Sequence, residues 1–189
     1  MNIEKKKQIL LDSLRIPVIG APLFIVSNPK LVIEQCKAGI IGSFPALNAR
    51  TEEELEKWMI EINEEIEKYK KKEPNKKIAP FAVNQIVHQS NTRLRHDVEM
   101  CVKYKAPIVI TSLRPPGEVV EAVHSYGGLV FHDVINMKHA KRAISEGVDG
   151  IIAVCAGAGG HAGTLSPFAL VKEVKEIFDG FIILSGSMS

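Results

Sequence analysis

The stretch that decides the fold is G-I-I-A-V-C-A-G-A-G-G-H-A-G-T-L-S-P-F, residues 150–168. Its first part, from Ile151 to Cys155, is apolar throughout, which is typical of a strand buried on both faces in a parallel sheet. A glycine-rich loop around His161 follows. Ser166 and Pro167 then indicate the N-cap and the first position of a helix, because Ser accepts from free backbone N–H groups and Pro lacks an N–H. This order predicts an α/β protein with a ligand site at the loop.

The glycines of this loop indicate a binding site. They let backbone N–H groups approach a flat or anionic ligand closely, and the loop follows the carboxyl end of its strand, where α/β folds bind ligands. The loop contains Gly157, Gly159, Gly160 and Gly163 around one histidine, His161. We therefore take His161 as the candidate catalytic residue. The alternative is that the glycines form only a tight turn and that His161 is an ordinary surface side chain.

The composition is that of an ordinary globular domain. The chain has 189 residues, of which 46% are hydrophobic and 24% charged, enough for one domain with a substantial core. Its formal net charge of +2 is too small to indicate a nucleic-acid partner. Three cysteines, Cys36, Cys101 and Cys155, lie far apart in apolar contexts without a C-x-x-C motif. They predict reduced core thiols in a cytoplasmic protein.

We expect neither a membrane span nor a signal peptide within these residues. No stretch approaches the ~18 apolar residues that a spanning helix needs. Asp12 and Arg15 interrupt the apolar residues near the N-terminus, which excludes the apolar centre of a signal peptide. We therefore expect no association with a membrane.

Strands and helices alternate along the chain. Short apolar runs predict seven strands, at 17–24, 38–44, 78–84, 107–113, 128–134, 150–156 and 181–187. Amphipathic spacing and capping signals predict helices over 3–14, 28–37, from Thr51 onwards, 92–104, 118–126, 137–146 and 167–178. Thr51 and Glu54 have the spacing of a capping box, in which each side chain satisfies a free amide near the start of the helix.

Apolar strands alternating with helices predict a parallel sheet with right-handed crossovers. A doubly wound sheet is one solution. The first strand is not followed by G-x-G-x-x-G, and polar residues or glycines end nearly every strand, which favours a TIM (β/α)8-type barrel. A barrel needs eight strands and ~250 residues, so we expect an incomplete barrel with the eighth strand missing, as one domain over residues 1–189. Its exposed edge strands predict poor solubility or a homo-oligomer.

The chain resembles the nitronate monooxygenase family, formerly called 2-nitropropane dioxygenases, FMN-dependent enzymes on a TIM barrel. Five motifs carry the resemblance, spread over almost the whole chain in the order of the family. They are the first-strand loop at Ala21-Pro22-Leu23, F-A-V-N ending at Asn84, E-G-V-D-G at 146–150, A-G-G-H-A-G at 158–163 and L-S-G at 184–186. The ordered set is more specific than any one of its members.

The resemblance implies a flavin site and a reaction. Asn84 would hydrogen-bond the flavin, with Gly159 and Gly160 against it and the Ala21, Pro22 and Leu23 loop beside it. Ser185 and Gly186 would begin the cradle for the FMN phosphate. His161 would be the base that removes a proton from a nitroalkane carbon or orients a nitronate, with O2 as the second substrate. Histidine suits that role because it titrates near neutral pH.

The chain also departs from the family pattern. Many members have Gln-Gly where this chain has Val154-Cys155, and Glu where it has Gly157. The second half of the phosphate site would lie beyond Ser189. A half-coordinated phosphate loses charge-assisted hydrogen bonds worth roughly 1.5–3 kcal/mol each, so we expect weak FMN binding.

Other polar residues allow two interpretations. His132 and Asp133 end a predicted strand, where they either contact substrate or flavin or merely close the strand. Thr111 and Ser112 occupy the matching place one strand earlier. The remaining histidines, His88, His96, His124 and His139, fall on or beside predicted helices, where we expect them to face solvent. We expect no metal site, because nothing in the spacing of the histidines predicts tetrahedral ligands.

Three other functions remain open. An FMN- and NADH-dependent enoyl-acyl-carrier-protein reductase shares the fold and a similar glycine-histidine loop. A phosphate-binding isomerase or aldolase would use a barrel without flavin, but no strand here ends in a lysine or glutamate suited to that chemistry. An inactive truncated fragment is the third alternative.

Overall fold

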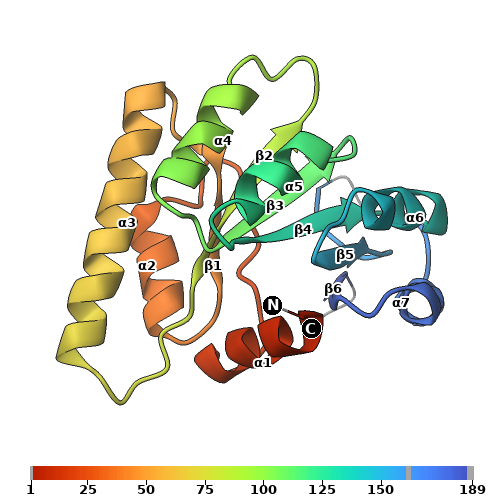
Figure 1. The fold of residues 1–189 in the computed structure, drawn as a ribbon, viewed down its shortest axis with the longest axis horizontal. Coiled ribbons are helices and arrows are strands. Elements are labelled where there is room, and N and C mark those ends of the chain that lie inside the picture. The colour runs from red at the N-terminus through yellow and green to blue at the C-terminus, as the bar shows by residue number, and fades with distance from the viewer. Residues whose placement is uncertain (1, 161–162, 187–189) are drawn as a thin grey trace.

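Six parallel strands form one sheet in the computed structural model, which describes residues 2–160 and 163–186. The strands lie side by side in chain order, and helices follow them, so the sheet curls as in part of a (β/α)8 barrel (Figure 1). The predicted fold class, an incomplete α/β barrel of the TIM type, is therefore confirmed. The strands are β1 (Gly42–Pro45), β2 (Phe81–Val87), β3 (Ile108–Leu113), β4 (Leu129–Val134), β5 (Gly150–Val154) and β6 (Phe181–Ser185).

The α-helices of the described residues begin close to the predicted positions. They are α1 (Ile3–Ser13), α2 (Pro29–Lys37), α3 (Glu52–Lys72), α4 (Leu94–Lys103), α5 (Gly117–His124), α6 (Met137–Ser145) and α7 (Pro167–Ile177), with a 3-10 turn at Ala46–Asn48. Thr51 caps α3 by accepting from Glu54 N at 3.1 Å, as expected. Ser166 stands at the N-cap of α7, but its side chain makes no capping hydrogen bond.

The segment 17–24, predicted as the first strand, pairs with the sheet at a single point. Ile19 forms an isolated parallel bridge with Ile41, flanked by two backbone hydrogen bonds of 2.8 and 3.0 Å. Pro17 and Pro22 lack the N–H groups that a longer ladder needs. The described residues therefore hold six strands and one bridge, where the sequence predicted seven strands.

The two faces of the sheet carry separate apolar clusters, because successive side chains of a strand point to opposite sides. The larger cluster lies between the outer face and helices α2 to α7. The inner face carries a smaller cluster whose strand members include Ala82, Ile108, Ile110, Phe131 and Ile152. Leu10 of α1 packs into this inner cluster, so α1 covers the amino end of the inner face, apart from the other helices (Figure 1).

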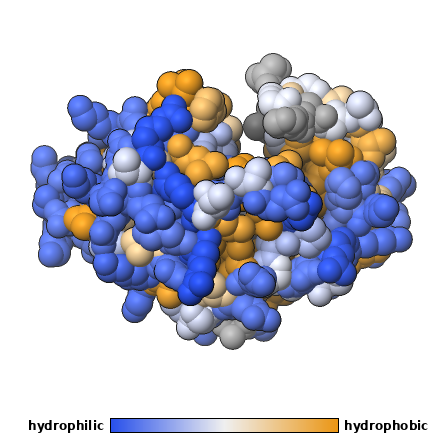
Figure 2. Space-filling view, turned by 90° about the horizontal axis from the view of Figure 1, so that it is seen from above, coloured by the Kyte–Doolittle hydropathy of each residue, from blue (hydrophilic) through white to orange (hydrophobic). Residues whose placement is uncertain are grey.

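The surface is hollowed between two raised parts when seen from above, and apolar residues gather along this hollow (Figure 2). Exposed apolar side chains include the run from Leu23 to Val26, whose members are 48 to 68% exposed. None of the helices in the described ranges combines the length and the apolar character needed to cross a bilayer.

Candidate functional site

Polar side chains collect on the inner face near the carboxyl ends of three neighbouring strands. They are Asn84 of β2, Ser112 of β3 and Asp133 of β4. Each lies two residues after a member of the inner cluster, namely Ala82, Ile110 and Phe131 respectively. Residues two apart on a strand share a face, so these three side chains face the inside of the curled sheet. In barrels of this type the carboxyl end of the sheet is where chemistry takes place.

A chain of hydrogen bonds links the three side chains. Asn84 Nδ2 donates to Ser112 Oγ at 2.9 Å, and Ser112 Oγ donates to Asp133 Oδ2 at 2.6 Å. Asn84 Nδ2 also donates to the backbone oxygen of Ile110 at 3.3 Å. Asn84 is only 6% exposed. These bonds form one network across β2, β3 and β4, which we call the inner relay.

The carboxyl group of Asp133 is the titratable end of the inner relay. Burial raises its pKa from an ordinary 3.8 to about 6, and the hydrogen bond from Ser112 only partly opposes this effect. No charged side chain of the described residues compensates the carboxylate. A buried carboxyl group that titrates near neutral pH is typical of functional sites.

His132 points to the opposite face of β4 from Asp133. It shares its orientation with Val130 and Val134, which belong to the outer cluster, and its Nδ1 lies 2.8 Å from Thr111 Oγ1. Burial lowers the pKa of His132 from 6.5 to about 4, and the neighbouring His139 of α6 adds to this effect. The structure therefore separates the two residues that the sequence placed together at the end of this strand.

The predicted phosphate residues lie at the end of β6 beside the loop that follows β5. Ser185 pairs with Val154, and the backbone oxygen of Ser185 accepts from Cys155 N at 2.8 Å. Gly186 has φ +114°, and a Cβ there would lie 2.8–2.9 Å from backbone atoms of residues 155–158. Only glycine therefore fits this contact between the two loops.

The loop after β5 leaves open space beside its glycines. A Cβ built at Gly159 or Gly160 meets no atom of the described residues within 4 Å, and Gly160 has φ +70°. Backbone with room in front of it can accept a flat ligand. His161, the candidate catalytic residue, lies outside the described residues.

The loop containing Ala21, Pro22 and Leu23 is held by a side chain that the sequence analysis did not single out. Asn48 Nδ2 donates to the backbone oxygens of Leu23 and Ser27 at 2.9 and 2.8 Å, and its Oδ1 accepts from Ile25 N at 3.1 Å. Ile25 has φ +67°, a conformation that strains a β-branched residue. The clamp by Asn48 stabilises this strained, apolar loop.

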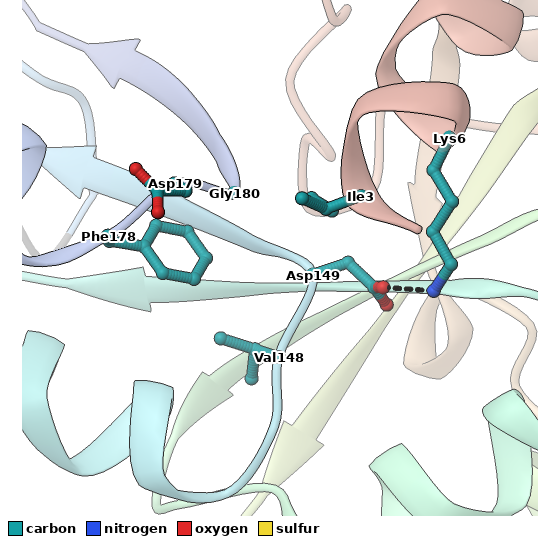
Figure 3. A pocket seen from close by; sticks show the side chains of 7 residues that line it. All are labelled: Ile3, Lys6, Val148, Asp149, Phe178, Asp179 and Gly180. Carbon is teal, nitrogen blue, oxygen red and sulfur yellow. Dashed lines mark hydrogen bonds and ion pairs between the residues drawn. The ribbon is translucent and has the colours of Figure 1, made fainter. Parts of the chain in front are cut away.

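The amino end of the sheet is built differently. A cavity of about 360 Å³ lies between α1 and the starts of β5 and β6 (Figure 3). Beside it, buried Asp149 accepts from Lys6 Nζ at 2.5 Å, from His124 Nε2 at 2.7 Å and from Val130 N at 2.9 Å. His124 is exposed, as the sequence predicted, and its ring also binds this buried carboxylate. Since this cavity lies at the end opposite to the inner relay, we do not assign it to the candidate site.

The described residues contain no group of three or more His, Cys, Asp or Glu side chains that could hold a metal ion. The three cysteines are buried and unpaired. Burial raises the pKa of the Cys36 thiol to about 11 and that of Cys101 to about 12, so neither is a reactive thiolate at neutral pH.

A curled parallel sheet with its polar residues at the carboxyl ends defines an enzyme-type α/β barrel site. The sequence model of the family described as nitronate monooxygenase matches residues 6–188, and the chain belongs to this family.

Three relatives illustrate the similarity. A curated dehydrogenase of Rhodococcus jostii, acting on a hydroxy-methyl-oxo-octahydroindene-carboxyl-CoA, is 24% identical over 90% of this chain and 44% of its own length. The structure of FabK from Thermotoga maritima has a TM-score of 0.75 at 24% identity, over 93% of this chain and 53% of that one. Nitroalkane oxidase from Streptomyces ansochromogenes has a TM-score of 0.76 at 19% identity, over 93% and 60%. The chain thus spans about half the length of these relatives.

The residues present fit a flavin. Both donor contacts of Asn84 are made by its Nδ2, and none of the described residues donates to its Oδ1. An acceptor without a partner among the described residues is therefore left on the inner face, and the flavin ring carries an N–H group that can donate to it. The open space at Gly159 and Gly160 suits the flat ring. The free acceptor of Asn84 and the space beside the two glycines are thus consistent with the FMN that the resemblance implies.

Proposed function

We propose that this chain is an FMN-dependent oxidoreductase that oxidises alkyl nitronates with O2, on a single barrel-type domain over residues 1–189. The family match over residues 6–188 supports an oxidoreductase of the monooxygenase type. The observation that carries the choice of cofactor is the Asn84 carboxamide, whose oxygen has no partner among the described residues. The proposal concerns the part of the site that these residues form.

The residues of this chain have distinct proposed roles in holding the cofactor. Asn84 would accept from the ring N–H of FMN, with the backbone at Gly159 and Gly160 beside the ring. The hydroxyl group of Ser185 and the backbone N–H of Gly186 would meet the phosphate, as donors at the start of a loop commonly do. The loop of Ala21, Pro22 and Leu23 would form the apolar wall that Asn48 stabilises.

The reacting proton is assigned to His161. Its imidazole would accept a proton from a nitroalkane carbon, or hold a nitronate in place when the substrate arrives already deprotonated. FMN supplies the redox step that amino-acid side chains cannot perform. Asp133 faces the same side of the sheet as Asn84, so it belongs to the proposed site. For His132, which faces the helices, we propose a structural role.

The test compares the purified chain with two histidine variants. The chain is purified without added flavin and titrated with FMN. Its visible spectrum is recorded, together with its O2 consumption with an alkyl nitronate and with the corresponding nitroalkane. His161→Ala should keep the flavin spectrum but lose roughly 100- to 10,000-fold in rate with a nitroalkane, the range for a general base. His139→Ala, an exposed histidine on α6, is the matched control and should change neither.

Each other result excludes part of the proposal. A protein that takes up no FMN from solution would contradict the cofactor. Flavin that is bleached by NADH and reoxidised by an enoyl thioester, without nitronate oxidation, would instead indicate the reductase alternative. Equal activity in His161→Ala and the wild type would remove His161 from the chemistry.

A further inference from the structure

Asp133 and Asn84 stand on different strands and are joined by a single hydroxyl group. The Ser112 hydroxyl has one proton, and it donates this proton to Asp133 Oδ2 at 2.6 Å. The oxygen of Ser112 can then only accept, and it accepts from Asn84 Nδ2 at 2.9 Å. An ionised carboxylate is an acceptor only, so it sets the direction of every hydrogen bond in the inner relay.

We propose that Asp133 is a positioning residue: through Ser112 it holds the Asn84 carboxamide with its nitrogen toward β3 and its oxygen free. This edge of the sheet would then select a planar ligand that presents an N–H group, and it would disfavour the same ligand without that donor. The identity of the ligand rests on the proposed function, whereas the orientation of Asn84 does not.

The backbone contact of Asn84 supports the same orientation. Its Nδ2 also donates to the backbone oxygen of Ile110, at the longer distance of 3.3 Å. Both neighbours on β3 therefore act as acceptors, and a carboxamide turned by 180° would place its oxygen against two acceptors. An amide oxygen that faces two acceptors loses both hydrogen bonds, which disfavours the turned form.

The surroundings of Asp133 indicate that the carboxylate is not kept for stability. Its neighbours across the sheet are Ser112 on β3 and Ile152 on β5, neither of which is charged. The nearby histidines, His132 on the other face of β4 and His139 on α6, form no hydrogen bond with it. A half-buried carboxylate without a counter-ion is destabilising, and local costs of this kind are typical of functional sites.

The orientation can be tested in the protein without any ligand. The side-chain NH2 signals of Asn84, assigned with an Asn84→Asp variant, are followed by NMR between pH 4.5 and 8, a range set to bracket a Asp133 pKa of about 6. We expect them to move with a midpoint near the pKa of Asp133. This movement should be lost in Asp133→Asn, which cannot ionise, and in Ser112→Ala, which interrupts the inner relay.

The matched control is Thr111→Val, one residue away on the other face of β3, where the hydroxyl contacts His132. It removes a buried hydroxyl of similar size but not from the inner relay, so the pH-dependent movement of Asn84 should persist. Signals that do not move in the wild type, or that move equally in Asp133→Asn, would overturn the proposal.

Ligand selection is tested with FMN and its N3-methyl analogue, which lacks the ring N–H. The wild type should bind FMN roughly tenfold more tightly, as expected for one hydrogen bond of about 1.4 kcal/mol. Ser112→Ala and Asp133→Asn should bring the ratio toward one, and Thr111→Val should keep it. An unchanged ratio in Ser112→Ala would overturn the selection. If neither flavin binds to the wild type while the NMR coupling persists, the proposed function fails and the orientation stands.

Discussion

One aspartate stands out at each end of the sheet, the buried Asp149 and the half-buried Asp133, and their hydrogen-bond partners differ. Asp149, at the amino end, accepts from two cationic or basic side chains and one backbone N–H, and it ties α1 to the strands. Asp133, at the carboxyl end, accepts from one hydroxyl group, and burial raises its pKa to about 6. Both carboxylate oxygens of Asp149 therefore accept hydrogen bonds, two of them from side chains that can carry a positive charge. The carboxylate of Asp133 accepts one hydrogen bond, from a neutral hydroxyl group.

This difference indicates a division of labour within one fold. In (β/α)8 barrels the carboxyl end carries the reaction and the amino end contributes stability. A network whose members are all satisfied makes a structure rigid, whereas a network with a free acceptor can bind a ligand. The Asn84 oxygen, which accepts from none of the described residues, and the strained Ile25 both lie in the candidate site, away from the amino end.

We expect the largest effect from a substitution that breaks the ion pairs of Asp149 with Lys6 and His124 at the amino end of the sheet. Asp149→Asn should lower the free energy of unfolding by about 3–5 kcal/mol, because it leaves Lys6 and His124 without a carboxylate partner. Urea denaturation measures this change. Asp179→Asn, at an exposed position lining the same cavity, is the control and should stay within about 0.5 kcal/mol. Equal effects of the two substitutions would remove Asp149 from its structural role.

The second effect is a dependence of stability on pH, to which Asp133 and His132 contribute with opposite signs. Asp133 binds its proton more tightly in the folded than in the unfolded chain, so its contribution to stability is present at low pH and is lost as pH rises from 3.8 to about 6. His132 binds its proton less tightly when folded, so its contribution is present above pH 6.5 and is lost as pH falls to about 4. The two contributions therefore oppose each other.

Single substitutions should expose each contribution. Relative to the wild type, Asp133→Asn should gain about 3 kcal/mol of stability between pH 4 and pH 7, since it removes the cost of ionising a buried carboxyl group. His132→Gln should lose stability relative to the wild type as pH rises over the same range, because it lacks the contribution that His132 makes above its lowered pKa. Denaturation at several pH values measures both. Parallel profiles of all three proteins would contradict the assignment.

The smallest expected effect concerns the loops after β5 and β6. Gly186→Ala should cost about 1–2 kcal/mol, because its φ of +114° disfavours any side chain and a Cβ would press on backbone. It should also weaken FMN binding. Gly159→Ala, where a Cβ meets open space, is the paired control for stability and should be nearly neutral. A neutral Gly186→Ala would show that the two loops can separate freely.

Most elements of the fold could be predicted from the sequence, because each carries its own local signal. The helix after Thr51 shows this: its cap and its apolar spacing both lie within the helix itself. The segment 17–24 could not be predicted correctly, since its apolar run resembles a strand while Pro17 and Pro22 prevent a ladder. Whether such a run pairs at one point or several depends on its neighbours.

The candidate site was predictable in position but not in detail. Asn84 and Asp133 could be found because each is a polar residue that follows an apolar run near the carboxyl end of its strand. The separation of His132 from Asp133 follows from the alternation of side chains once the register is known. Ser112 and Asn48 act through contacts with residues more than 20 positions away, which no local pattern contains. His161 and its role stay a prediction.

The order of the strands in the sheet is the order in which they are synthesised, which bears on how the chain folds as it leaves the ribosome. Every strand pairs with the one made just before it, so the sheet can grow from β1 to β6 one unit at a time. The contact between Lys6 and Asp149 departs from this order, because 143 residues separate its partners. The first helix can pack Leu10 against the inner cluster of the earlier strands, but its ion pair with Asp149 forms only after the start of β5 has appeared.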